Sequence, residues 1–377
     1  MKAKGPVAAE LTWAQVHAFR LKRHHLTGRA KKTDLPQVVA DIGGVQAQVM
    51  SAAELQVAVR VDCTVADVRK ALWTDRALVK TWLMRGTLHL ARSEDLPIYC
   101  AAMSTRGIKV RPSWLKYFQL TEGELWNVVD EIGAALNGTP LTREELIAVV
   151  GNGKPARILE SLRSGWGGML KPAARDGTLC FGPSRGQSVT FVSPQKWLPS
   201  WRRVDRDTAF AQMARRYLRA YGPASKTDFA RWWGAWPGVG NAAWSALGDE
   251  IVPVSVEGAR LDAHAADIDE IRGATVEDSV QLLPGFDPYV LGHASRDHLV
   301  DPAFASRVSR TAGWISAVVL VDGEAVGTWT HTMANQVLRL TVSPFRRIAP
   351  RVKTQVGIRA EELAHAMSAK KTEVKFA

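Results

Sequence analysis

The sequence predicts an α+β protein made of tandem winged helix-turn-helix domains followed by a C-terminal β-rich domain. Three observations lead to this class. Residues 121–192 read as three helices followed by a β-hairpin, which is the element order of a winged helix-turn-helix. The same order returns about 80 residues further along the chain, as expected of an internal repeat. After residue 279 the apolar pattern changes from helical spacing to strands.

A chain of 377 residues should divide into two to four domains, because single hydrophobic cores stop growing well before this length. The element pattern places the boundaries close to residues 118, 200 and 278. The expected domains are an N-terminal winged helix that carries a Gln-Ala-Gln motif (1–118), a second (119–200) and a third winged helix (201–278), and a β-rich domain with a C-terminal helix (279–377).

The second repeat is the most legible. Residues 122–136 carry apolar side chains at helical spacing, and Thr142 with Glu145 resembles a capping box that would start the next helix. Residues 156–175 are expected to form the third helix. The wing is then formed by two strands around a Gly/Pro turn, residues 178–181 and 189–192.

The other two repeats follow the same order with weaker signals. The third is predicted to contain helices and a wing at residues 207–221, 225–233, 241–247 and 251–261. The first is predicted to contain paired helices and a strand at residues 64–73, 76–84 and 87–90. The β-rich domain is predicted to contain strands and a closing helix at residues 280–283, 314–321, 326–330, 337–342 and 361–370. Disorder is expected only in the first ten residues and in the Lys370-Lys371 tail.

The charge of the chain indicates its partner. The chain has 49 Lys and Arg against 37 Asp and Glu, a net charge of +12. Such an excess favours association with a polyanion, most simply double-stranded DNA. No segment reaches the roughly 18 apolar residues of a membrane helix, and no apolar segment follows the charged N-terminus. We therefore expect no membrane partner, and a monomer located in the cytoplasm at the nucleoid.

Metal and cofactor motifs are not readable in the sequence. Cys63, Cys100 and Cys180 are widely spaced and lack a Cys-x-x-Cys pattern. The histidines, including His24, His25, His293 and His298, show no metal-ligand spacing and are interpreted as ordinary surface or core residues. There is also no glycine-rich phosphate-binding motif. We expect no metal and no cofactor.

Gln46 and Gln48 are the residues most suggestive of chemistry. Neutral amides can orient a water molecule but cannot ionise, so they suit a reaction whose leaving group departs without strong acid or base help. On a regular helix, residues i and i+2 would point about 200° apart, and the pair would then have no joint role. Gly43-Gly44 permits a non-helical path in which both amides face one ligand.

Three segments carry a family resemblance. They are residues 42–48 (Ile-Gly-Gly-Val-Gln-Ala-Gln), 78–90 (Leu-Val-Lys-Thr-Trp-Leu-Met-Arg-Gly-Thr-Leu-His-Leu) and 282–292 (Leu-Leu-Pro-Gly-Phe-Asp-Pro-Tyr-Val-Leu-Gly). Trp314-Ile315 and residues 326–329 fit the same C-terminal pattern. Together, and in this order, they resemble the AlkZ-like winged-helix DNA glycosylases over nearly the whole chain.

This resemblance implies a C-shaped array of winged helices with a basic concave face. It also implies that Gln46 and Gln48 position water at the anomeric carbon of an alkylated nucleotide. The expected activity is that of a monofunctional DNA glycosylase acting on N7-alkylated purines, including bulky or crosslinking adducts in duplex DNA. Because an N7-alkylated purine is already cationic, its departure needs little protonation, which agrees with the neutral amides.

Six basic residues are candidates for DNA binding. Arg85 and His89 are placed at a helix-to-strand junction of the first repeat, where a winged helix commonly meets phosphate. The alternative is an arginine that complements a helix dipole and a surface histidine. The other four lie on the predicted third helix of the second repeat, which normally faces DNA or, alternatively, is a solvated face: Arg157, Arg163, Lys171 and Arg175. A second basic run covers residues 20–32.

Two rival interpretations remain open at this point. Residues 236–240 resemble the hairpin of helix-hairpin-helix glycosylases, and Asp262 follows at roughly the distance of their catalytic aspartate, although residues 251–260 read as a β-hairpin. The broader rival is a non-catalytic winged-helix DNA-binding protein or transcriptional regulator. Asp287 is interpreted as a turn residue that holds the β-rich domain; the alternative is that it reaches the DNA cleft. One or two of the 14 tryptophans could stack on a displaced base.

Overall fold

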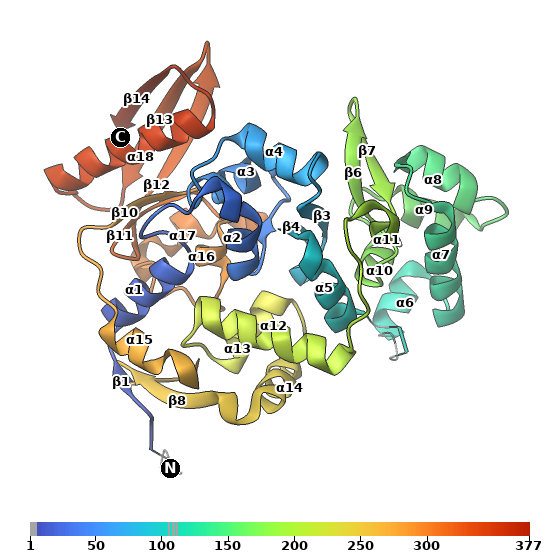
Figure 1. Ribbon diagram of the computed structural model, residues 1–377, viewed down its shortest axis with the longest axis horizontal. Helices are drawn as coiled ribbons and strands as arrows, with labels where there is room; N and C mark the ends of the chain where they lie inside the picture. The colour runs from blue at the N-terminus through green and yellow to red at the C-terminus, as the bar shows by residue number, and fades with distance from the viewer. Residues whose placement is uncertain (1–5, 105, 108–109, 111) are drawn as a thin grey trace. The chain divides into compact units, whose positions relative to one another are not determined.

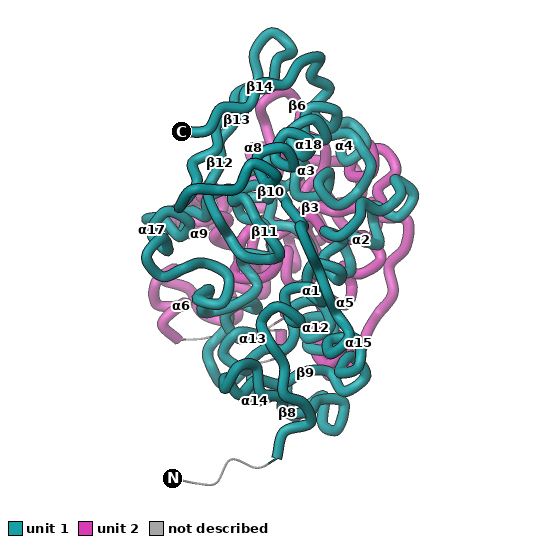
Figure 2. The backbone as a smooth tube through the Cα atoms, turned by 90° about the vertical axis from the view of Figure 1, so that its left-hand side faces the viewer, with its two compact units in different colours: residues 1–69, 214–377 teal, residues 70–213 magenta. Residues whose placement is uncertain are grey.

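The computed structural model describes residues 6–104, 106–107, 110 and 112–377 (Figure 1). The chain forms two compact units, shown in different colours in Figure 2. Unit 1 combines the N-terminal residues up to 69 with residues 214–377, and unit 2 is formed by residues 70–213. Helices and strands are mixed throughout, which confirms the α+β class. The four-domain division stays a prediction.

The N-terminal elements of unit 1 have clear local signals. α1 (Trp13–Arg23) begins with a capping box, in which the side chains of Thr12 and Gln15 each accept a hydrogen bond from the other's backbone N–H. The elements that follow are α2 (Leu35–Asp41), β2 (Val45–Gln46), α3 (Met50–Ala58) and α4 (Val65–Trp73). The boundary between the units falls within α4.

The elements predicted for the third repeat are present. Ser225 and Asp228 form a capping box that starts the helix after Gly222-Pro223. The elements are α12 (Arg206–Tyr221), α13 (Lys226–Trp233), α14 (Gly238–Leu247), β8 (Ile251–Val256), β9 (Ala259–His264) and α15 (Ile268–Gly273). The sequence did not predict β1 (Glu10–Leu11), which pairs in parallel with β8. Of the ten residues expected to be disordered, 1–5 lie outside the described residues and Glu10 is in this strand.

The C-terminal part of unit 1 is a five-stranded sheet with the order β10-β11-β12-β13-β14. Its strands are β10 (Val280–Leu283), β11 (Val318–Val321), β12 (Glu324–Ala334), β13 (Val337–Pro344) and β14 (Lys371–Phe376). The short helices α16 (Pro288–Leu291) and α17 (Ala305–Val308) lie between β10 and β11 in the sequence. α18 (Pro350–Ala366) packs on the sheet through Val352, Val356 and Leu363 (Figure 1).

Two predictions for this part are wrong. The closing helix begins at Pro350, earlier than expected, and ends at Ala366. The Lys370-Lys371 tail is not disordered, because residues 371–376 form β14 in parallel register with β13, from Val337↔Lys371 onward. Periodicity alone misses such an edge strand, since its pairing partner decides its conformation.

Unit 2 contains a β-hairpin, a group of helices and a second hairpin. The first hairpin is β3 (Leu78–Trp82) and β4 (Leu88–Arg92), paired antiparallel with Thr81 opposite His89. The elements that follow are α5 (Leu96–Met103), α6 (Pro112–Phe118), α7 (Glu122–Ala135), β5 (Leu141–Thr142), α8 (Arg143–Val150), α9 (Ala156–Arg163), α10 (Leu170–Arg175), β6 (Cys180–Arg185), β7 (Ser188–Val192) and α11 (Pro194–Trp197).

The structure corrects two predictions in unit 2. Residues 76–84, expected to be a helix, form β3, whose side chains are buried on both faces. A short apolar run buried on both faces looks the same in helix and strand. The expected helix at 156–175 is two helices, because a loop that contains Gly165, Gly167 and Gly168 separates α9 from α10. The predicted order of helices followed by a hairpin is nevertheless present.

The core of unit 2 explains why these elements pack together. Apolar residues of α7, such as Val128, Val129 and Ile132, share one buried cluster with Leu162 of α9 and Phe191 of β7. In the part of the chain that the structure describes, no helix is long and apolar enough to cross a membrane. That these elements form tandem winged helices stays a prediction.

Candidate functional site

Gly43-Gly44 ends α2 and turns the chain toward Gln46. The N–H of Gly43 donates to the Ala40 carbonyl at 3.1 Å, and the N–H of Gly44 donates to the Val39 carbonyl at 2.8 Å. This pair of bonds is a Schellman motif, which needs a left-handed residue after the helix. Gly43 and Gly44 have φ values of 70° and 87°. A Cβ on Gly43 would also lie 3.0 Å from Cζ2 of Trp232. The left-handed backbone and this close contact therefore both disfavour a larger residue at position 43.

The segment after this turn starts with the short strand β2 and is largely buried. Val45, Gln46 and Ala47 are all buried, at 0%, 8% and 1% exposure, and Gln48 is exposed. Successive side chains of an extended chain point to opposite sides. Within β2, Gln46 therefore points to the side opposite Val45, and of the two glutamines only Gln48 is exposed. The helical arrangement that would separate the amides is not adopted here.

α3 anchors the Gln-Ala-Gln segment to the segment that follows β10. The Gln56 amide donates to the Gly285 carbonyl at 2.9 Å and approaches the Gln46 carbonyl at 3.5 Å. One turn later, the Arg60 guanidinium forms two hydrogen bonds with the Asp287 carboxylate, at 2.8 and 2.7 Å, and both side chains are fully buried. Arg60 and Gln56 were not identified from the sequence, because nothing local distinguishes them from other polar helix residues.

Asp287 has the structural role that the sequence predicts. Besides binding Arg60, it accepts a hydrogen bond from the N–H of Tyr289 at 2.9 Å and so caps α16. Because its side chain is completely buried, it offers no surface to DNA. Residues 284–288 therefore hold the end of α3 in place, and with it the Gln-Ala-Gln segment.

The tip of the β3–β4 hairpin, in unit 2, is a separate candidate site. Its turn contains Arg85 and Gly86 with φ values of 57° and 67°. Nδ1 of His89 donates to the Thr87 carbonyl at 2.9 Å, which leaves Nε2 to accept a hydrogen bond from Arg85 at 3.3 Å. Burial and the neighbouring Arg85 charge lower the pKa of His89 to about 3, so the ring is neutral.

This geometry corrects the alternatives considered for Arg85 and His89. Arg85 does not end a helix, because the preceding residues form β3. His89 is not a surface histidine but is 1% exposed. It orients Arg85, and a direct contact of His89 with DNA stays a prediction that its burial does not support.

Lys171 and Arg175 of α10 lie beside this turn. A Cβ on Gly86 would lie 3.4 Å from Nη2 of Arg175 and 3.8 Å from Nζ of Lys171. Burial lowers the pKa of both groups, and the Arg175 charge lowers that of Lys171 further. In the described part of the chain, neither cation forms an ion pair with a carboxylate. We call Arg85, Lys171 and Arg175 the hairpin-tip cluster.

Arg157 and Arg163 are not part of this cluster. Arg157 bonds to the Glu124 carboxylate at 2.5 Å and to the Gln119 carbonyl at 2.8 Å, which ties α9 to the start of α7. Arg163 is exposed at the end of α9. Contacts of both residues with DNA stay predictions, and the ion pair gives Arg157 a structural use instead.

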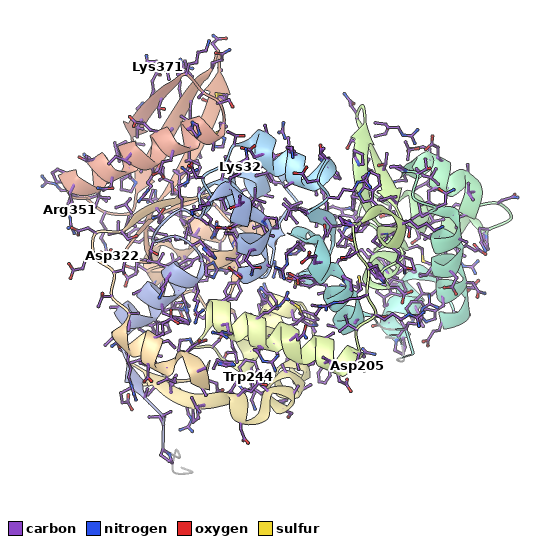
Figure 3. The ribbon with its side chains drawn as sticks, in the orientation of Figure 1. Lys32, Asp205, Trp244, Asp322, Arg351 and Lys371 are labelled. Carbon is purple, nitrogen blue, oxygen red and sulfur yellow. The ribbon has the colours of Figure 1, made fainter. Side chains whose placement is uncertain are left out.

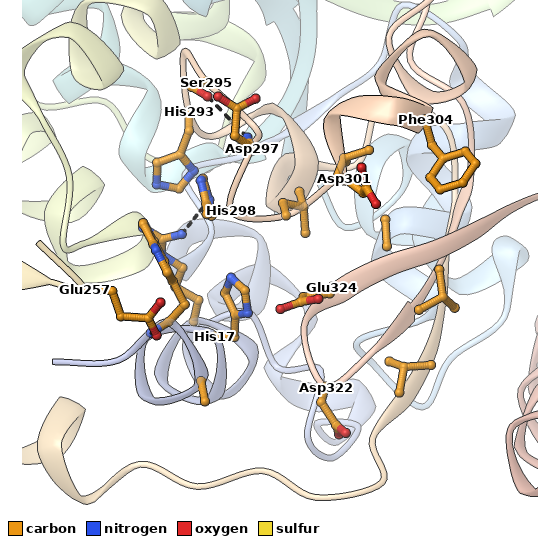
Figure 4. Close-up of a pocket in the computed structure, with 18 of the residues that line it drawn as sticks. His17, Glu257, His293, Ser295, Asp297, His298, Asp301, Phe304, Asp322 and Glu324 are labelled. Atoms are coloured by element: carbon orange, nitrogen blue, oxygen red, sulfur yellow. Dashed lines mark hydrogen bonds between the residues drawn. The ribbon is translucent and has the colours of Figure 1, made fainter. Parts of the chain in front are cut away.

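Unit 1 also contains a large cavity, which Figure 4 shows in close-up. It has a volume of about 1200 Å³. His17 and His298 line it, and Arg20 donates to Nε2 of His298 at 2.9 Å. Burial and Arg20 lower the pKa of His17 to about 3 and that of His298 to about 2. Among the described residues that line this cavity there is no member of the Gln-Ala-Gln motif.

His24, His293 and Asp262, the aspartate of the helix-hairpin-helix interpretation, lie in environments typical of structural residues. His24 and His293 are buried, and burial lowers the pKa of each well below its usual value, as expected of core histidines. Asp262 lies on β9 and accepts a hydrogen bond from Nε1 of Trp244 at 2.8 Å; Trp244 is labelled in Figure 3. Since residues 251–264 form the predicted hairpin, the helix-hairpin-helix interpretation is not supported.

Comparisons with known proteins now give the family. The model of the family described as DNA glycosylase AlkZ-like matches residues 39–366. The chain belongs to the AlkZ-like DNA glycosylase family. It is 37% identical over 346 residues to an interstrand DNA cross-link repair glycosylase of Streptomyces sahachiroi, covering 89% of this chain and 91% of that protein. The solved structure of Streptomyces sahachiroi DNA glycosylase AlkZ superposes with a TM-score of 0.86 at 34% identity, covering 98% of this chain and 100% of that one.

This membership confirms the resemblance drawn from the motifs. As an AlkZ-like DNA glycosylase, the protein is a hydrolase that acts on N-glycosyl bonds. Family membership therefore supports the interpretation as an enzyme over that as a non-catalytic regulator.

Proposed function

We propose that this glycosylase is monofunctional and hydrolyses the N-glycosidic bond of N7-alkylated purines in duplex DNA, with Gln46 and Gln48 positioning the water. The observation that supports this proposal is that β2, not a helix, follows the Gly43-Gly44 turn, because in an extended chain residues i and i+2 face the same side. Neither amide can act as a strong acid or base, so the substrate must contain its own leaving-group activation.

An N7-alkylated purine meets this requirement because its base is already a cation. The bond between C1′ of the sugar and N9 breaks, and its electron pair neutralises the departing base. The sugar passes through an oxocarbenium-like state, which the amide oxygens of Gln46 and Gln48 stabilise through their partial negative charge. The positioned water adds to C1′ and releases its proton, leaving an abasic site and the free alkylated base.

The substrate class extends to bulky and crosslinking adducts. The curated relative from Streptomyces sahachiroi is named as a glycosylase that repairs interstrand DNA cross-links. A net charge of +12 supports sequence-independent binding to phosphates, and Lys171 and Arg175 are cations without carboxylate partners among the described residues. The tandem winged helices are proposed to form a C-shaped array with a basic concave face for the duplex.

Incubation with a duplex that contains N7-methylguanine, followed by alkaline cleavage of abasic sites, tests the proposal. Wild type should give strand breaks at the lesion. Gln46→Ala with Gln48→Ala should reduce the rate at least about 100-fold, the size of effect seen when a group that stabilises the transition state is removed. Binding to undamaged duplex should persist, because these amides are not needed for phosphate contacts.

Gln37→Ala is the matched control. Gln37 is an exposed glutamine on α2 whose amide donates to Asp41 within the same helix at 2.6 Å. This variant should cleave like wild type. A double variant that retains full activity, or a wild type that releases neither N7-methylguanine nor bulkier N7 adducts nor crosslinks, would contradict the proposal.

A further inference from the structure

Trp166 is the most exposed tryptophan in the described part of the chain. It is 79% exposed, against 61% for Trp236 and 47% for Trp314. The Trp314 ring packs edge-on against Phe286, with 5.0 Å between ring centroids, and the Trp236 ring covers Gly238. Within the described residues Trp166 has no such ring partner. An indole left in solvent has an unfavourable hydration free energy that packing elsewhere could relieve.

The loop that carries Trp166, between α9 and α10, is held on both sides. Before Trp166, Arg143 donates to the carbonyls of Leu162 and Ser164 at 2.9 and 3.1 Å. After it, Gly167 has a φ of 82°, and a Cβ there would lie 2.8 Å from Trp82. The loop backbone is therefore packed against the rest of unit 2, and the Trp166 side chain points into the solvent.

The same close packing brings Gly167, the residue after Trp166, close to Lys171 of the hairpin-tip cluster. A Cβ on Gly167 would lie 3.2 Å from Cγ of Lys171, and Lys171 in turn lies beside Gly86 of the hairpin turn. Arg163, which is exposed, precedes Trp166 by three residues. The loop that carries the exposed indole is thus flanked by Arg163 and Lys171, and Lys171 and Arg175 have no carboxylate partner among the described residues.

We propose that Trp166 stacks on an unpaired or displaced nucleobase of the bound DNA, while the neighbouring cations hold its phosphates. Phosphate contacts explain the cations but give the indole no role. An apolar protein partner explains the indole but not Lys171 and Arg175, which have no carboxylate partner among the described residues. A nucleic acid with one base out of its stack offers both an anionic backbone and a free π-face. The inference rests on the proposed function only in taking DNA as the ligand.

The test is equilibrium binding to two duplexes that differ only by one unpaired base. It uses the full chain with Gln46→Ala and Gln48→Ala, so that base removal cannot interfere. Trp166→Ala should weaken binding to the duplex with the unpaired base roughly tenfold, and binding to the fully paired duplex less than about twofold. Trp166→Phe should restore most of the difference, because a phenyl ring also stacks. Trp236→Ala is the matched control and should change neither affinity.

A second measurement covers the case in which Trp166→Ala folds poorly. Quenching of tryptophan fluorescence by iodide should decrease when the duplex with the unpaired base is added, and this decrease should be absent in Trp166→Phe. The inference is overturned if Trp166→Ala binds both duplexes like the parent, or loses affinity equally for both.

Failure of the proposed function is recognised separately. If wild type releases no alkylated base but the effect of Trp166 on binding is present, the stacking role stands and the proposed reaction is wrong. If bases are released but Trp166 makes no difference to either duplex, the reaction stands and the stacking role is wrong.

Discussion

Unit 1 and unit 2 each carry a group of basic residues, and the two groups are used in opposite ways. In the basic run at residues 20–32, Lys22 pairs with Glu270 at 3.0 Å and Arg23 pairs with Asp267 at 2.7 Å. Arg29 and Lys32 of this run also form ion pairs, with Asp62 and Asp67. Lys171 and Arg175 of the hairpin-tip cluster have no such partner among the described residues.

This difference teaches that a cluster of cations in the sequence does not by itself mark a DNA-binding surface. The charge of the N-terminal run is largely neutralised by carboxylates that come from distant parts of the chain. Lys171 and Arg175 of unit 2 are partly buried, which costs free energy, and they remain available to bind an anion from outside the protein. We therefore expect changes in unit 1 to affect stability, and changes in the hairpin-tip cluster to affect DNA binding.

The largest expected effect is an acid-dependent loss of stability that is greater in unit 1. His17 and His298 have folded-state pKa values of about 3 and about 2, below the ordinary 6.5, because they are buried beside Arg20. The native state keeps both neutral, whereas the unfolded chain binds protons below pH 6.5. Their stabilisation is thus complete above pH 6.5 and is lost as the pH falls, by about 2 kcal/mol each between pH 6.5 and 5.

Hydrogen exchange of the two units between pH 7 and 5 measures this difference. Unit 1 should lose protection earlier, since His24 and His293 add to the effect there, whereas in unit 2 only His89 has a comparable environment among the described histidines. Equal loss of protection in both units would contradict the assignment of acid sensitivity to the Arg20 surroundings.

The next largest effect is expected at the buried pair of unit 1. Asp287→Asn removes the only charge partner that the described residues provide for the fully buried Arg60. An uncompensated buried charge should lower the free energy of unfolding by about 3–5 kcal/mol. Denaturant unfolding measures the change, and Asp297→Asn, at an exposed aspartate of the same unit, is the control. A change below about 1 kcal/mol would contradict this prediction.

A smaller effect, on binding alone, is expected at the hairpin-tip cluster. Lys171→Gln should weaken binding to undamaged duplex and reduce the slope of log affinity against log salt by about 0.9, the value of one lost phosphate contact. Titrations at several salt concentrations measure the slope. Unfolding should change little. An unchanged slope would show that Lys171 does not touch phosphate.

The smallest effect is expected at Lys22, which provides the comparison with Lys171. Lys22 is largely exposed and pairs with Glu270 on the surface. Lys22→Gln should change the free energy of unfolding by less than about 1 kcal/mol and leave the salt slope as in wild type. A decrease of the slope equal to that of Lys171→Gln would remove the distinction between the two groups of cations.

Local signals accounted for most of the helices and for the central motif. The capping boxes at Thr142 and Ser225 start helices as expected, and the wing predicted after Leu247 is the β8–β9 hairpin. Gly43-Gly44 could be identified from the sequence because a helix that ends in a Schellman motif needs a left-handed residue there. The family resemblance then supplied roles for Gln46 and Gln48 that periodicity alone could not.

Predictions failed where a distant partner decides the local conformation. Residues 76–84 form a strand because they pair with β4, and residues 371–376 form a strand because they pair with β13. The break between α9 and α10 depends on how closely Gly167 approaches Trp82. The conformational propensities of the separate segments do not reveal which segments pair with each other.

The sequence by itself determined that this protein is basic, that a Gly-Gly turn precedes two glutamines, and that its elements follow the order of an AlkZ-like glycosylase. These features are local or compositional, so they can be read one segment at a time. Only the tertiary structure decided which cations are neutralised, that Arg60 and Asp287 support the glutamine segment, and that Trp166 is exposed on a loop that lies close to Lys171. Charge neutralisation and burial depend on which distant groups meet, and folding alone settles that.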